Sequence, residues 1–136
     1  MANENLPGHI RAFFNPASYP HPVKDVQFIQ THISWIFLTG EVAYKIKKPV
    51  DLGFVNFSTL VKRKKTCEAE ISLNRRLAPD IYLDLLSIYK EGDAYRMGGN
   101  SNRNHRIIDY AIKMVQFSQH DLFDVRLQQG HFNPAW

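Results

Sequence analysis

The clearest pattern of apolar and polar residues lies between residues 35 and 48. Large apolar and β-branched residues occupy positions 35–38, a composition that strands favour. Gly40 interrupts the run, and residues 42–47 then alternate with the period of a strand. One side carries Val42, Tyr44 and Ile46, and the other carries Ala43, Lys45 and Lys47. The pattern predicts a hairpin that ends near Pro49, because proline cannot donate to a sheet.

The longest helical pattern follows the hairpin. Ser58 or Thr59 is expected to cap a helix that runs to about Leu77, because the residue before Pro79 avoids helical backbone. At about 100° per residue, one broad face forms. It carries Leu60, Cys67, Ile71, Asn74 and Leu77.

Glu70 falls inside this inward arc of the long helix. An unpaired buried carboxylate is costly, so Glu70 needs a cation or hydrogen bonds. Two alternatives remain open from the sequence. Either Glu70 pairs with Lys45 or Lys47, or it lies at the edge of the face and pairs locally, for instance with Asn74 or a nearby arginine.

The N-terminal quarter has a weaker pattern. Residues 1–20 predict an irregular arm in which Ile10, Phe13 and Phe14 could dock on the domain. Residues 23–30 predict a short helix, because Pro22 suits a first helical turn and apolar residues recur at helical spacing.

The C-terminal half returns to strands. Extended segments at 81–89 and 94–97 predict a hairpin around Gly92, and 107–115 predict a further strand. That strand should carry Ile108, Tyr110, Ile112 and Met114 on one face. Residues 118–136 predict a hinge helix and a tail, because positions 118–121 resemble a capping box. The whole order predicts a single α+β domain over residues 1–136, with an antiparallel β-sheet, one main helix and short flanking helices.

Composition narrows the classes of partner. The formal charge is +4, which favours an anionic partner, and a nucleotide would satisfy it as well as nucleic acid. A nucleic-acid surface is disfavoured because the basic run at 62–65 is spread around the helix without interleaved aromatic residues. The single cysteine, Cys67, excludes an internal disulfide and a cysteine-cluster metal site. We find neither a signal peptide nor a long apolar run, so we expect a cytoplasmic protein without a membrane partner.

Two stretches suggest chemistry. Residues 42–45 fit the pattern V-A-x-K, in which a strand lysine contacts nucleotide phosphates and a small residue leaves room for adenine. The alternative is a strand face with solvated lysines. Thr31 and Ser34 form a hydroxyl-rich loop before the first strand, which could lie over phosphates or simply bond nearby backbone.

Several blocks, in the right order, resemble the N-terminal part of aminoglycoside phosphotransferase-like proteins. The blocks are residues 31–40, 43–50, 57–60, 67–70 and 73–79, within roughly residues 18–130. The resemblance implies a protein-kinase-like N-terminal lobe that holds ATP. In that group the kinase-like domain is often joined to a C-terminal P-loop ATPase domain.

The resemblance also implies roles for individual residues. Lys45 would contact the α- and β-phosphates, with Lys47 as the less favoured choice, and Glu70 would orient that lysine through an ion pair. The remaining expected cofactor-binding residues are Ala43, Ser34, Met114, Val115 and Gln116, the last three through backbone that meets the adenine edge.

Other parts of a phosphotransferase are missing from the sequence. It has no H-G-D-x-x-x-x-N loop, no later metal-binding aspartate, no G-x-G-x-x-G loop and no Walker A sequence. We therefore expect no catalytic or metal-binding residues here, magnesium only together with an absent C-terminal catalytic lobe, and no phosphate transfer by the chain alone.

This expectation leaves two kinds of protein partner and two alternative functions to consider. A separate catalytic lobe or P-loop domain is the expected one, and self-association through Phe117, Leu122, Phe123 and Trp136 is another. A non-catalytic nucleotide- or protein-binding module and a basic nucleic-acid-binding domain are the alternative functions.

Overall fold

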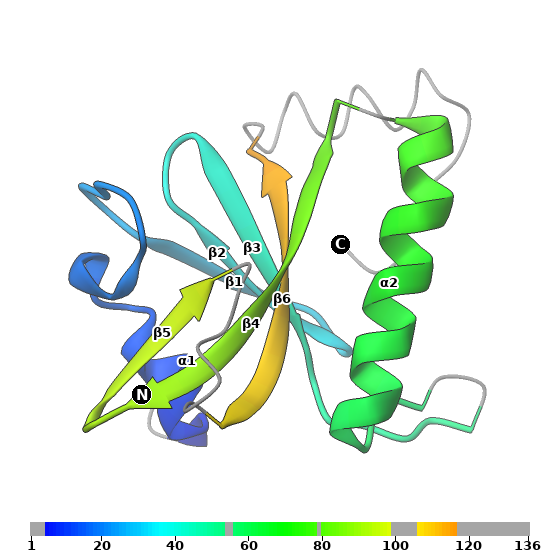
Figure 1. Ribbon diagram of the computed structural model, residues 1–136, viewed down its shortest axis with the longest axis horizontal. Coiled ribbons are helices and arrows are strands. Elements are labelled where there is room, and N and C mark those ends of the chain that lie inside the picture. The colour runs from blue at the N-terminus through cyan, green and yellow to red at the C-terminus, as the bar shows by residue number, and fades with distance from the viewer. Residues whose placement is uncertain (1–4, 54–55, 79, 99–105, 117–136) are drawn as a thin grey trace.

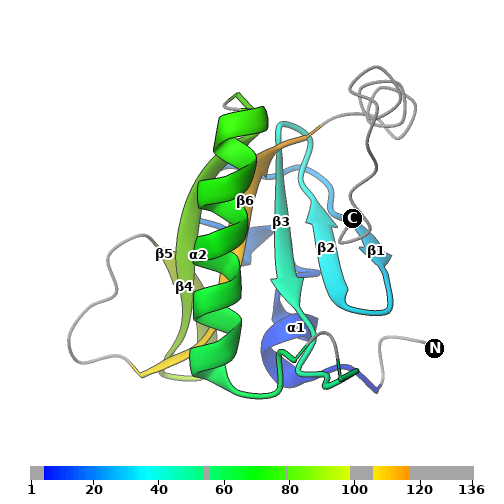
Figure 2. The ribbon, with the colours of Figure 1, turned by 90° about the vertical axis from the view of Figure 1, so that its right-hand side faces the viewer.

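The architecture is an open antiparallel sheet with one main helix packed against it. The structure, a computed structural model, describes residues 5–53, 56–78, 80–98 and 106–116. Six strands lie in the order β1-β2-β3-β6-β4-β5 (Figures 1 and 2). They are β1 (Gln27–Gln30), β2 (Ser34–Leu38), β3 (Val42–Lys47), β4 (Tyr82–Glu91), β5 (Ala94–Gly98) and β6 (Ile107–Val115). The helix α2 (Leu60–Leu77) runs along one side of β4 and β6, which confirms the predicted α+β class.

Two short helical turns cover the other side of the sheet. They are α1 (Gly8–Ala12) and η2 (Pro16–Ser18), so the described part of the arm predicted as irregular contains two helical turns. Asn15 caps η2 by accepting a hydrogen bond from the Ala17 amide. Ile10 and Phe13 are fully buried in the core and Phe14 packs at its edge, which confirms that this segment docks on the domain.

The short helix predicted at residues 23–30 was also wrong. The chain instead forms the edge strand β1, paired with β2 so that Phe28 lies opposite Phe37 with ring centroids 5.1 Å apart. Phe28 packs on one side of the sheet and Ile29 on the other. Pairing with β2 therefore overrides the local helical spacing.

The central hairpin agrees with the sequence pattern. Gly40 takes φ of 114° in the turn between β2 and β3, a conformation open to glycine. Tyr44 and Ile46 lie in the core with α1, while Lys45 and Lys47 lie on the face toward Glu70 of α2. The predicted separation of the two faces of β3 is confirmed.

The long helix begins and ends where the sequence predicts. The Thr59 hydroxyl caps it by accepting a hydrogen bond from the Lys62 amide at 3.2 Å. Cys67 and Ile71 are buried against β6, as expected. Leu77 is 57% exposed, so its predicted inward position was wrong. At 100° per residue Leu77 lies about 80° from Cys67, at the margin of the buried arc.

The remaining strands match the prediction apart from one face. β4 and β5 form the expected hairpin around Gly92. A register shift pairs Ile88 with Asp109 and Tyr89 with Ile107, so Ile108 has no partner on β4. Such a bulge reverses the alternation of side chains. Ile108 therefore packs on the α1 side, whereas Tyr110, Ile112 and Met114 pack under α2.

Some predictions fall outside the described residues. These are the hinge helix and tail at 118–136, and with them Phe117, Leu122, Phe123 and Trp136. Within the described residues, no helix is long and apolar enough to cross a membrane.

Candidate functional site

A cluster of charge lies between β3 and α2. Glu70 of α2 pairs through Oε2 with the ammonium of Lys45, and through Oε1 it accepts a hydrogen bond from Lys47 Nζ at 2.7 Å. Asn74, the local partner considered from the sequence, contacts the backbone of Glu70: its side-chain amide donates to the Glu70 carbonyl oxygen. The Glu70 side chain therefore binds both strand lysines.

This cluster is removed from water. The side chains of Lys45, Lys47 and Glu70 are 0%, 2% and 10% exposed. Two lysines facing one carboxylate give the cluster an excess positive charge when all three are ionised. A buried excess charge is costly unless a further anion compensates it.

The pKa values reflect this balance. Burial lowers the pKa of Lys45, the attraction of Glu70 opposes that change, and the repulsion of Lys47 adds to it. Burial alone would raise the pKa of Glu70, but the attraction of Lys45 and Lys47 outweighs burial and leaves that pKa below its usual range. Glu70 is thus an anion at neutral pH.

The two lysines differ in their other partners. Lys47 Nζ also lies over the ring of Phe57, 4.9 Å from its centroid, where a cation is attracted by the π face. Within the described residues, the polar partner of Lys45 is Glu70 alone. An ammonium group has three donors, so Lys45 keeps donors for a further acceptor.

The β2–β3 ladder arranges the same face from polar to apolar. Ser34 lies opposite Lys47, Ile36 opposite Lys45, and Leu38 opposite Ala43. The Ser34 hydroxyl is buried without a hydrogen-bond partner among the described residues. The Thr31 hydroxyl, by contrast, accepts from the Ser34 amide at 3.0 Å, which is the local turn chemistry weighed from the sequence.

The apolar end of this face reaches β6. Ala43 clusters with Ile36 and Leu38, and its register partner on β6 is Met114. Met114 is fully buried beneath α2.

Val115 and Gln116, two of the residues expected at the adenine edge, use their backbone amides in hydrogen bonds within the protein. The Val115 amide donates to the Ile81 carbonyl at 2.8 Å, and the Gln116 amide donates to the Glu41 carbonyl at 3.0 Å. The Gln116 side chain accepts from the Gly40 amide at 2.8 Å. These two amides are therefore hydrogen-bonded within the protein, and the expectation that the backbone of residues 114–116 meets the adenine edge stays a prediction.

Cys67 lies beside the charged cluster. The sequence analysis placed it only on the inward face of the long helix. It is fully buried, and burial raises the pKa of its thiol to about 12. The thiol is neutral at physiological pH and adds no charge beside Glu70.

A second buried carboxylate, Asp109, escaped the sequence reasoning altogether. Asp109 accepts from Arg63 Nε at 3.1 Å and contacts His9 Nε2 at 2.9 Å, and Arg63 also donates to the Phe57 carbonyl at 3.0 Å. These contacts tie α1, α2 and β6 together. No short motif could reveal them, because the residues are far apart in the sequence.

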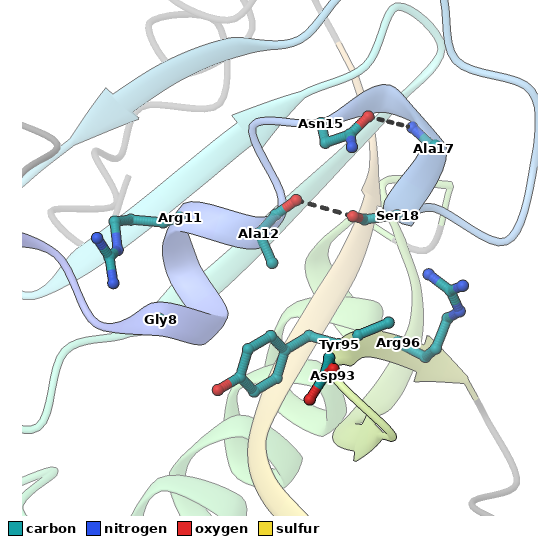
Figure 3. Close-up of a pocket in the computed structure, with 10 residues that line it drawn as sticks. Gly8, Arg11, Ala12, Asn15, Ala17, Ser18, Asp93, Tyr95 and Arg96 are labelled. Carbon is teal, nitrogen blue, oxygen red and sulfur yellow. Dashed lines mark hydrogen bonds between the residues drawn. The ribbon is translucent and has the colours of Figure 1, made fainter.

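A separate groove lies away from this cluster. It encloses about 760 Å³ between α1, η2 and β5 (Figure 3). Its lining residues include Arg11, Tyr95 and Arg96, while Asn15 and Ser18 are used in local hydrogen bonds. The groove lies on the α1 side of the sheet and includes none of Lys45, Lys47 and Glu70. The described residues also contain no group of three or more side chains suited to hold a metal ion.

Comparison with known proteins gives a partial match. No protein-family model matches the chain. No solved structure matches it. The chain is 43% identical over 68 residues to Uncharacterized protein Rv2004c of Mycobacterium tuberculosis (strain ATCC 25618 / H37Rv), and equally to Uncharacterized protein Mb2027c of Mycobacterium bovis. The match covers 48% of this chain and spans only 14% of each relative.

Proposed function

We propose that this chain is the ATP-binding small lobe of an aminoglycoside phosphotransferase-like kinase. The observation that carries the proposal is the ion pair between Lys45 of β3 and Glu70 of α2. Protein kinases use a lysine on their third strand, held by a glutamate from the following helix, to bind nucleotide phosphates. The resemblance of residues 31–79 to that family supports the same assignment.

The order of side chains along β3 fits a nucleotide. Ala43 lies at the apolar end and Lys45 two residues further on, about 7 Å away at the usual strand rise. An adenine would lie against Ala43, Leu38 and Ile36, and the phosphates would meet the donors that Lys45 keeps.

Phosphate transfer requires groups that this sequence does not contain. The aspartate that receives the acceptor proton and the residues that hold magnesium have no counterpart motif in the chain. A catalytic lobe or a P-loop domain would supply them. The long relatives, of which the match spans 14%, have ample further sequence for such parts.

The test is ATP binding by calorimetry. We expect the wild-type chain to bind ATP and Lys45→Met to bind at least about tenfold more weakly, because a charge-assisted hydrogen bond contributes about 1.5–3 kcal/mol. Lys65→Met is the matched control, since Lys65 is exposed on α2 and its loss should leave affinity unchanged. Urea unfolding of each variant checks that the fold is kept.

Two outcomes would contradict the proposal. One is the absence of ATP binding by the folded wild-type chain at millimolar nucleotide. The other is an equal loss of affinity in Lys45→Met and Lys65→Met, which would indicate unspecific attraction to a basic protein.

A further inference from the structure

One edge of β5 is open among the described strands. The strand lies at the end of the sheet order and pairs only with β4. A two-residue turn joins these strands, so Glu91 and Ala94 form their first hydrogen-bonded pair. Pairs alternate along an antiparallel ladder, and the backbone N–H and C=O groups of Tyr95 therefore point away from β4. Such groups form a template for pairing with a further extended segment.

The groove between α1, η2 and β5 follows this edge. It is bordered on one side by four consecutive residues, 93–96, and on the other by residues of α1 and η2 such as Arg11 and Ser18. Side chains of a strand alternate between the two faces of a sheet, so a hollow that consecutive residues border runs along the strand edge. Its volume of about 760 Å³ gives a second polypeptide access to the Tyr95 backbone. Met97 is buried, which limits this access to the first half of β5.

Positive charge flanks this part of the edge. Arg11 of α1 and Arg96 of β5 line the groove on opposite sides of Tyr95, and both are exposed (Figure 3). Neither arginine forms an ion pair with a described residue. Asp93 in the turn is the one carboxylate among the described lining residues, so two guanidinium groups accompany a single acid. Guanidinium groups bind carboxylates through paired hydrogen bonds, which favours an acidic ligand.

The open edge and the arginines select the same kind of partner. We propose that this groove binds an extended acidic segment of another polypeptide. The backbone of that segment would exchange hydrogen bonds with Tyr95, and its carboxylates would meet Arg11 and Arg96. Main-chain pairing distinguishes a polypeptide from a nucleic acid, and the arginines distinguish an acidic segment from a neutral one. The groove includes neither Lys45 nor Glu70, so the inference is independent of the proposed ATP site.

The first test measures charge recognition. The probe is a fluorescein-labelled peptide of alternating glutamate and valine, about five residues long like a typical strand, and fluorescence anisotropy reports its binding. We expect the double variant Arg11→Glu, Arg96→Glu to bind this peptide at least about tenfold more weakly than the wild type, and to bind the corresponding lysine–valine peptide instead. The matched control, Lys65→Glu with Arg76→Glu, makes the same change of net charge at exposed positions of α2 and should alter affinity less than about twofold.

The second test measures main-chain pairing. The same peptide with N-methyl groups along its backbone keeps its carboxylates but has no backbone donors, so we expect it to bind at least about tenfold more weakly. In the complex with the unmodified peptide, NMR should show slower hydrogen exchange of the Tyr95 amide than in the free chain, because that amide is then paired.

Each test can overturn the inference. The absence of glutamate–valine peptide binding by the folded wild-type chain at about 1 mM would do so, as would an equal loss of affinity in the two double variants. Unchanged exchange of the Tyr95 amide, or equal binding of the N-methylated peptide, would show that the edge of β5 is not the contact. Equally tight binding of a single-stranded oligonucleotide that displaces the peptide would indicate a general site for polyanions.

The charge test does not depend on one pair of substitutions. If circular dichroism shows that Arg11→Glu, Arg96→Glu does not fold, Arg11→Gln with Arg96→Gln removes the same two cations. Its control is then Lys65→Gln with Arg76→Gln, and the comparison of peptide affinities gives the same decision.

Discussion

Replacing Glu70 by glutamine should destabilise the fold, because it removes the negative charge of the cluster. The side-chain volume hardly changes, so the effect reports on the charge. The variant leaves Lys45 and Lys47 facing each other without an anion. Removing one partner of a buried ion pair costs about 3–5 kcal/mol. The Glu70 side chain is 10% exposed, and Lys45 can lose its proton when its partner is gone, and both reduce the cost. We therefore expect a loss at the lower end of this range, about 3 kcal/mol. Against a total of about 5–15 kcal/mol this is a large fraction of stability.

Urea unfolding followed by circular dichroism measures the change. A loss of about 3 kcal/mol moves the midpoint down by about 1.5 M when the slope is about 2 kcal/mol per molar. Glu68→Gln is the matched control, since Glu68 is exposed on the same helix and its change should stay within about 0.5 kcal/mol.

The pH dependence adds a second criterion. The folded-state pKa of Glu70 is depressed, so its stabilising contribution is present above the unfolded pKa and is lost as pH falls through the folded one. The gap between wild type and Glu70→Gln should therefore narrow in acid, where a protonated Glu70 is as neutral as glutamine. A gap below about 1 kcal/mol at pH 7, or one that does not narrow in acid, would refute this reasoning.

Two further changes probe the buried charges. Asp109→Asn should lower the free energy of unfolding in urea by about 2–3 kcal/mol, because it weakens the hydrogen bonds of Asp109 with charged Arg63 and with His9. The control, Asp93→Asn on the exposed turn, should change it little. Equal effects of the two substitutions would contradict the structural role of Asp109. The triple variant Lys45→Met, Lys47→Met and Glu70→Leu replaces the whole cluster with apolar side chains. Its stability should stay within about 1 kcal/mol of wild type or rise, while ATP binding is lost. A stability as low as that of Glu70→Gln would contradict the expectation that apolar packing can replace the buried charges.

The candidate site could be predicted largely because two periodicities define it. A strand period of two places Lys45 and Lys47 on one face, and about 100° per residue places Glu70 on the inward arc of the helix. The sequence could not choose between the lysines and Asn74 as partners of Glu70. That choice depends on where α2 lies relative to β3, which β4 and β6 decide.

The errors arose where long-range pairing decides the local structure. Residues 27–30 form a strand because β2 offers an edge to pair with, not because of their own spacing. The bulge that turns Ile108 away depends on its register with β4. The hydrogen bonds from the Val115 and Gln116 amides to the Ile81 and Glu41 carbonyls, which the sequence analysis did not include, also depend on contacts between distant segments.

The charged cluster is hard to explain by stability alone. The helix α2 is already held against β6 by Cys67 and Ile71, which pack on Ile112 and Met114. Asp109 joins three elements, but the cluster at Glu70 joins only β3 to a helix that is otherwise anchored. Apolar side chains of similar volume would serve that packing at least as well as buried ions do. Sites that depart from such local rules tend to be functional. An excess cation with unused donors at Lys45, beside a carboxylate that both strand lysines bind, is the arrangement that the proposed anionic ligand would complete.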